Sequence, residues 1–391
     1  MKMISLFKKY PIYSILLFCL PFLIGMQPFF PKGLQSLLIN FRLVILPIFL
    51  IVRFYREFNI VLLVLLILYL FFLRMFTIPS NENDFILVLL SLLSSITFFK
   101  FGHYVGKKSK INEVYIFLVH GITCFNLCTL LIYYSITVGA IDVITFFELT
   151  QKELSEGVFR FSIGNPIELP LTICSLFYAS LLLLPNRKPQ LFSSSLNLIL
   201  TFISQSRIVV VIALLIFVVE FWQSSRSRKL LVLSLIFVFI LYVHDDALLI
   251  LESFVQRLSG EDLGSMDDRS FLYDIAFQYL NIINLIIGSG LTSSSMLLHD
   301  LTGSYRTIES VFLQFLFELG IIGTGLLFLT FFLGKKSIAI PSFRNIIIIL
   351  FWIQILFFSS IYTLMPFAFF LFGITSRTYN NHKTELLFSN N

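Results

Sequence analysis

The sequence predicts an all-α polytopic membrane protein with about twelve transmembrane helices and a large outer loop between spans 9 and 10. Of the 391 residues, 57% are hydrophobic and only 13% are charged, and the mean hydropathy is +0.91. The 22 acidic and 28 basic residues are too few to cover a water-facing surface, so a soluble globular protein is excluded. The apolar residues instead gather in runs close to the roughly twenty residues that a helix needs to cross a bilayer.

The expected spans follow these apolar runs along the chain. The first run comes after Lys2, Lys8 and Lys9, as in a signal peptide, but no small-residue cleavage site follows it, which predicts an uncleaved first span. The last two runs could also form one broken hairpin. The expected spans are 10–26, 34–52, 58–78, 85–101, 114–138, 167–184, 191–203, 208–222, 230–243, 309–333, 345–360 and 362–374.

Two long polar segments interrupt the runs and divide the chain. The expected parts are five spans in 1–138, an outer loop at 139–165, spans 6 to 9 in 166–243, a large outer loop at 244–308, and the C-terminal spans with a cytoplasmic tail in 309–391. Polar groups are densest in the 244–308 loop, so catalytic residues are expected there. Apolar residues near helical spacing at 269–287 predict a short amphipathic helix on the outer face.

The basic residues indicate the orientation in the membrane. With the amino terminus inside, most of the 28 Lys and Arg residues lie in cytoplasmic connectors, as the positive-inside rule requires, and both termini are cytoplasmic. Because the net charge of +6 arises from these short clusters, no nucleic-acid partner is expected. The 4 cysteines lie in apolar runs and no His/Cys pattern has metal-ligand spacing, so no metal or cofactor is expected. Gly288-Ser289-Gly290 is interpreted as a turn.

Arginines on the outer side are the first candidates for a binding site. Arg207 opens a span at a tight bend, where a bulky cation is costly unless it reaches water or binds an anion. Arg269 begins the predicted loop helix, Arg160 precedes Gly164-Asn165-Pro166, and Arg306 stands just before the re-entering span. Guanidinium groups bind phosphates in a bidentate way, so several of them would suit a diphosphate. The alternative is that each reaches interfacial water or pairs with a nearby acid, as Asp267 or Asp268 could do for Arg269.

Acidic and histidine side chains supply the candidates for a general base. Glu309 lies in the first turn of its span, where the helix dipole stabilises a carboxylate and where a base could face a dry pocket. His299 on the same loop is an alternative base. Glu318 lies roughly 13 Å deeper on the opposite face by helical rise, so we expect it to bond a neighbouring span in a structural role.

The order and spacing of these motifs resemble one family. They are Arg160-Phe161-Ser162-Ile163-Gly164-Asn165-Pro166 before a span, Ser204-Gln205-Ser206-Arg207 opening a span, Arg269 in a long outer loop, and Glu309-Ser310-Val311-Phe312-Leu313-Gln314 running on to Glu318-Leu319-Gly320-Ile321-Ile322-Gly323. This pattern resembles the Wzy-type O-antigen polymerase and O-antigen ligase superfamily. The resemblance covers roughly residues 160–333, and the earlier spans match in hydropathy alone.

The resemblance implies a metal-independent glycosyltransferase with no cofactor, multi-pass in the bacterial cytoplasmic (inner) membrane and active at its outer face. Such enzymes transfer a growing glycan from undecaprenyl diphosphate to the next lipid-linked repeat unit of an O-antigen or capsular polysaccharide. By position, Arg207 and Arg269 would hold the donor diphosphate, with Arg160 assisting. Our own hypothesis is that Glu309 is the base. Further substrate-binding residues would be Arg160, Asn165, Ser206, His299 and Arg306. The partners implied are the undecaprenyl-diphosphate-linked oligosaccharide, the lipid bilayer, and a chain-length regulator and flippase of the same pathway.

Two other functions compete with a polymerase. Ligases of the superfamily have a histidine where this chain has Glu309, which favours the polymerase over a ligase. A flippase for the same lipid-linked sugars should show charged groups near mid-membrane and an internal repeat, and the sequence shows no such repeat.

Overall fold

The computed structural model describes residues 11–25, 37, 40–76, 82–108, 111–140, 189–204, 207–242, 271–302 without 272 and 276, 311–333, 369–370 and 373–374. Every element in this part of the chain is a helix. The chain forms two compact units, one of Met1–Ile39 with Ser109–Asp262 and one of Asn40–Lys108 with Leu263–Asn391. The predicted spans at 167–184 and 345–360 lie outside the described residues.

The first unit is built around α7 and α11. It contains α2 (Pro11–Gly25), α7 (Ile111–Thr137), α11 (Leu191–Ser204), α12 (Arg207–Gln223) and α13 (Arg226–Tyr242). Helix α7 packs against α2 and α11, and α11 also packs against α12 and α13. Small and polar residues permit these approaches, since Thr123 and Ser193 hydroxyls lie 2.5 Å apart and Asn126 donates to Asn197 at 3.3 Å.

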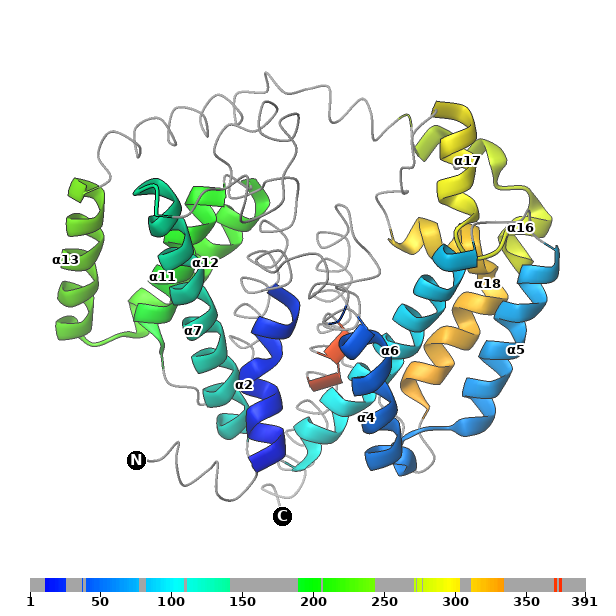
Figure 1. Cartoon of the computed structure of the whole chain (residues 1–391), viewed down its shortest axis with the longest axis horizontal. Helices are drawn as coiled ribbons and strands as arrows, with labels where there is room; N and C mark the ends of the chain where they lie inside the picture. Colours follow the sequence, from blue (N-terminus) through cyan, green and yellow to red (C-terminus); the bar gives the residue numbers. More distant parts are fainter. Residues whose placement is uncertain are drawn as a thin grey trace, which may run out of the picture. The chain divides into compact units, whose positions relative to one another are not determined.

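The second unit is built around α18 (Figure 1). It contains η2 (Phe41–Ile45), α4 (Leu46–Phe54), η3 (Tyr55–Glu57), α5 (Ile60–Phe76), α6 (Glu82–Lys108), α16 (Ile282–Ile287), α17 (Ser293–Thr302) and α18 (Val311–Phe332). Helix α18 packs against α5, α6, α16 and α17. Aromatic rings fill its contact with α6, where Phe99 meets Phe331 edge-on with ring centroids 5.4 Å apart.

Most predicted spans in the described part coincide with a helix. Two helices are long and apolar enough to cross a membrane, through Phe85–Val105 in α6 and Leu313–Phe332 in α18. Shorter apolar stretches of the same kind lie in α2, α5, α7, α11 and α12. Large apolar side chains of α5 are exposed, including Met75 at 85%, as expected of a helix that faces lipid. The number of about twelve crossings stays a prediction.

Helix α18 is broken at Gly320, which the continuous predicted span at 309–333 did not anticipate. Gly320 has φ 65° and ψ −176°, a conformation that glycine adopts at least cost. The carbonyls of Phe317 and Glu318 accept hydrogen bonds from the backbone N–H groups of Ser289 and Gly290, at 2.8 and 2.9 Å. The turn at 288–290 therefore pairs with the break and confirms that Gly288-Ser289-Gly290 is not helical.

The pairing leaves no room for a side chain on the turn. A Cβ atom on Gly288 would lie 2.5 Å from the carbonyl carbon of Leu319 and 2.6 Å from the carbonyl oxygen of Glu318. Gly288 also has a φ of 95°. Both facts tie the turn to glycine at this position.

Replacing Gly288 by alanine should destabilise the protein by about 2–4 kcal/mol, because the methyl group meets backbone atoms and the φ becomes strained. The measurement is the thermal unfolding midpoint of the protein purified in detergent. Gly325→Ala is the matched control, since a Cβ there meets nothing within 4 Å and alanine favours the helix. Equal midpoints for the two variants would contradict the close approach.

Candidate functional site

The side chain of Glu318 in α18 is the centre of a buried cluster of hydrogen bonds. It is 2% exposed, in the first half of α18. Its Oε1 accepts hydrogen bonds from the Ser294 hydroxyl and, at 3.0 Å, from Gln314 Nε2. The backbone N–H groups of Thr292 and Ser294 also donate to this carboxyl group. Ser294 and Gln314 are both buried, so the cluster is closed to solvent.

This arrangement makes Glu318 a cap for another helix. Helix α17 begins at Ser293, so the N–H groups at its start have no partner within the helix. The carboxyl group of Glu318 accepts two of the bonds available there and lies at the positive end of the helix dipole. The expected structural role is consistent with this geometry. The expected partner, a neighbouring span, is wrong, because α17 is a helix of only ten residues within the predicted 244–308 loop.

Tyr69 of α5 also forms hydrogen bonds to the backbone at the break in α18. The single hydrogen of its hydroxyl is shared between the carbonyl of Leu319, at 3.2 Å, and the carbonyl of Ile287 at the end of α16. The hydroxyl of Thr324 bonds the carbonyl of Phe315 at 3.2 Å across the same break. The carbonyls that the break frees are thus bonded by groups from α5, from the turn and from α18 itself.

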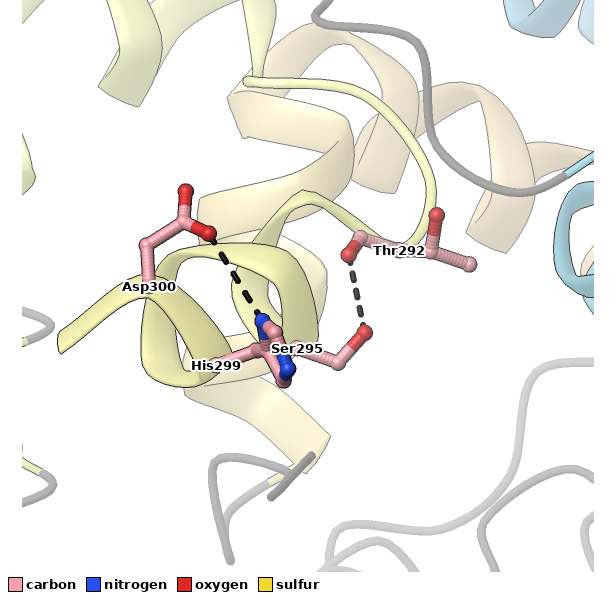
Figure 2. A network of polar contacts seen from close by, with 4 residues as sticks. All are labelled: Thr292, Ser295, His299 and Asp300. Atoms are coloured by element: carbon pink, nitrogen blue, oxygen red, sulfur yellow. Dashed lines mark hydrogen bonds and ion pairs between the residues drawn. The ribbon is translucent and has the colours of Figure 1, made fainter. Parts of the chain in front are cut away.

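Two hydroxyls near Glu318 retain hydrogen-bonding capacity. Ser289 Oγ and Thr292 Oγ1 are buried, with no hydrogen-bond partner among the described residues. Thr292 also has a positive φ of 69°. Its carbonyl accepts a bond from Ser295 Oγ at 2.9 Å, which helps to hold this conformation (Figure 2).

His299 is the one predicted site residue whose side chain the structure describes. It lies in the last turn of α17, where a positive charge would be favourable, and is half-buried. Its Nδ1 lies 3.7 Å from Asp300 Oδ1, so the two form an ion pair when the imidazole is protonated (Figure 2). Ser295 and His299 are one turn apart in α17.

Arg207 is the first residue of α12, and α11 ends at Ser204, so Arg207 begins a helix as predicted, whereas the bend itself lies outside the described residues. The remaining predicted site residues lie outside the described residues, so their convergence stays a prediction. They are Arg160, Asn165, Ser206, Arg269, Arg306 and Glu309.

The amphipathic helix predicted at 269–287 is two helical pieces. Residues 271–279 are helical where they are described, 280 and 281 are not, and α16 follows. Asn281 causes the interruption, because its backbone is extended and its side chain accepts from the N–H of Asn284 at 2.7 Å as an N-cap. The first piece packs into the unit through Ile275, which contacts a buried cluster with Leu298 of α17 and Phe317 of α18.

The sequence did not lead us to predict that Ser294 and Gln314 bond Glu318, or that Tyr69 bonds the backbone at the break in α18. Gln314 stands four residues before Glu318 and shares its helix face, a spacing that could have been noticed. Ser293-Ser294-Ser295 is a composition typical of a helix start. Tyr69 lies 250 residues from Leu319 in the chain, so no local signal links them.

Comparison with known proteins identifies one family. Residues 192–328 match the Wzy_C family, described as O-antigen ligase, which confirms the resemblance over that segment. No curated protein and no solved structure matches the chain. Members of the matched family act on lipid-linked glycans in a membrane, and the apolar helices agree with a membrane protein. Within the described residues, no group of three His, Cys, Asp or Glu side chains could hold a metal ion.

Replacing Tyr69 by phenylalanine should lower the thermal unfolding midpoint in detergent. The variant keeps the ring but leaves two carbonyls without this donor, at a cost of about 1–3 kcal/mol. Tyr279→Phe is the control, because that residue is exposed and its hydroxyl makes no hydrogen bond to a described residue. A midpoint for Tyr69→Phe equal to that of the control would show that the hydroxyl does not support the break.

Proposed function

We propose, from the match of residues 192–328 to the O-antigen ligase family, that the chain is a polysaccharide polymerase of the cytoplasmic membrane. It transfers a growing glycan from undecaprenyl diphosphate to a lipid-linked repeat unit at the outer face. The observation that carries this proposal is that the matched segment contains Arg207, Arg269 and Glu309 together.

The proposed reaction is an inverting glycosyl transfer. The hydroxyl oxygen of the acceptor sugar attacks the anomeric carbon of the donor, and the bond from that carbon to the diphosphate oxygen breaks. Glu309 takes the proton of the attacking hydroxyl. Arg207 and Arg269 neutralise the charge that develops on the departing diphosphate, and such fixed charges are usually the largest catalytic contribution.

The other site residues have supporting roles in this proposal. Arg160 and Arg306 add positive charge for the anionic donor, and Asn165, Ser206 and His299 supply hydrogen bonds to sugar hydroxyls or phosphate oxygens. His299 lies in the last turn of α17, and Arg306 and Glu309 follow it in the sequence. The side-chain types present are those that bind a sugar diphosphate, and the family resemblance implies a metal-independent reaction.

A ligase is the second candidate, because the matched family is described by that activity. A ligase would transfer the finished glycan to a final acceptor and would use the same diphosphate donor. Glu309 favours the polymerase, since the resemblance places a histidine at that position in ligases. The family match argues against a flippase, which would move the lipid-linked unit without glycosyl transfer.

Alanine substitutions of Arg207, Arg269 and Glu309 test the assignment. Each arginine variant should slow polymerisation by about a hundredfold or more, because a preorganised charge on the leaving group is lost. The measurement is the length of the polysaccharide ladder on a gel, with the amount of membrane protein determined by immunoblot. Arg228→Ala is the control, since Arg228 is an exposed arginine in a predicted cytoplasmic connector. Normal ladders from all three variants at normal protein levels would exclude the proposed mechanism.

A strain from which the protein is deleted separates the candidate functions by the intermediate that it accumulates. If the protein is a polymerase, single lipid-linked repeat units should accumulate at the outer face. Labelling intact cells with a membrane-impermeant sugar reagent measures them. Free full-length polymer would show a ligase instead. Units that remain protected inside the membrane would show a flippase.

A further inference from the structure

We propose that α16 is inserted in the outer leaflet of the membrane, where its exposed isoleucines contact lipid acyl chains and the 288–290 turn is the deepest point. Residues 281–292, all in the second unit, are called the re-entrant segment below. The sequence instead predicts a helix that lies on the outer face at 269–287. The contact with lipid does not depend on which reaction the protein catalyses.

The helices that contact the re-entrant segment indicate its depth. The hydroxyl of Tyr69 bonds the last carbonyl of α16, and Tyr69 is seven residues from the end of α5 that is predicted to face outward. Gly288 packs against Gly320, which is seven residues from Leu313, where the apolar stretch of α18 begins. At 1.5 Å per residue, both contacts are about 10 Å below the outer ends of these helices, within a hydrocarbon core of about 30 Å.

The turn at the bottom of the re-entrant segment has its N–H groups bonded within the protein, as hydrocarbon requires. An N–H group without a partner at that depth would be costly, because water does not reach it. In a loop exposed to water, the solvent would bond these groups and no such partners would be needed. The bonds run from Gly288 N–H to the carbonyl of Asn284 at 2.7 Å, from Ser289 N–H to that of Phe317 at 2.8 Å, from Gly290 N–H to that of Glu318 at 2.9 Å, and from Thr292 N–H to the Glu318 carboxyl group.

The start of α16 suits the boundary between headgroups and acyl chains. Asn281 is exposed, and its side chain accepts a bond from the N–H of Asn284 at 2.7 Å, so the polar cap stands at one end of an otherwise apolar turn. Six residues separate Asn281 from Ile287, or about 9 Å at 1.5 Å per residue. A helix that descends from the boundary at Asn281 therefore reaches the depth indicated by Tyr69.

The side chains that α16 exposes most are isoleucines, with Ile282 at 76% and Ile283 at 67%. Ile286 and Ile287 are also exposed, and residues 275–299 contain no Asp, Glu, Lys or Arg. Such a surface is unfavourable in water and favourable among acyl chains. Helix α5, which Tyr69 joins to α16, exposes large apolar side chains as well. Lipid is the occupant that fits both surfaces.

Spin labels on single cysteines test the depth of α16. Ile283→Cys and Ile286→Cys are made in a background without the 4 native cysteines, and the labelled protein is reconstituted in phosphatidylcholine vesicles. Electron paramagnetic resonance measures how accessible each label is to oxygen, which concentrates in hydrocarbon, and to a water-soluble nickel complex. Both side chains are exposed, so the substitutions remove no buried contact.

Two exposed leucines of the same unit are the matched controls. Leu68→Cys lies at the middle of α5 and reports lipid. Leu301→Cys lies in the last turn of α17, next to the exposed Asp300, and reports water.

The labels on Ile283→Cys and Ile286→Cys should be accessible to oxygen and lose access to nickel, as on Leu68→Cys, whereas the label on Leu301→Cys should keep access to nickel. Because α16 descends, the label on Ile286→Cys should be the deeper of the two. A second measurement uses vesicles of lipid brominated on its acyl chains. A bimane fluorophore on Ile286→Cys should lose fluorescence there, and one on Leu301→Cys should keep it.

Three results would overturn the inference. Nickel access at Ile283→Cys equal to that at Leu301→Cys would place α16 in water, and equal depths at Ile283→Cys and Ile286→Cys would show a helix lying flat at the interface. Low access to both oxygen and nickel would show that protein covers α16 in place of lipid. Disulfide cross-linking between two copies of Ile283→Cys would then identify a second copy of the chain as the occupant.

Discussion

The second unit depends on the hydrogen bonds that the backbone carbonyls of α18 accept at its break. A backbone carbonyl that is removed from both water and its helical partner costs several kcal/mol in an apolar environment, so each freed group must find a donor. At Gly320 the carbonyls of Phe317 and Glu318 take the N–H groups of the 288–290 turn, and Leu319 takes the hydroxyl of Tyr69. These bonds join α5, the 288–290 turn and α18. The turn is therefore fixed to the two apolar helices by hydrogen bonds to the backbone of α18.

The same constraint explains why two glutamates are buried in the part of the chain that the structure describes, although the chain has few acids. A helix that begins among apolar side chains leaves N–H groups that water cannot reach, and a carboxylate from a neighbouring helix satisfies them. Glu220 does this for the start of α11, and Glu318 does it for α17. In each case the acid is on the helix that packs against the one it caps. At Glu318 the cost of burying the carboxyl group is offset by hydrogen bonds from the Ser294 hydroxyl, Gln314 Nε2 and the N–H groups of Thr292 and Ser294.

Hydropathy was sufficient to predict most of the described helices, because burial in lipid requires long apolar runs and a helical backbone. It could not predict the break in α18, since residues 311–332 are apolar on both sides of Gly320 and hydropathy is insensitive to φ. The interruption at Asn281 was missed because the apolar spacing continues across a single capping residue. The partner of Glu318 was misassigned because it depends on a contact between residues 24 apart in the chain.

The contacts between α17 and α18 differ in how closely they specify the alignment of the two helices. Apolar packing between Leu298 and Phe317 favours contact of α17 with α18 at many relative angles, whereas the donors around Glu318 favour one. The directional contact is therefore the one that sets how the two helices are aligned.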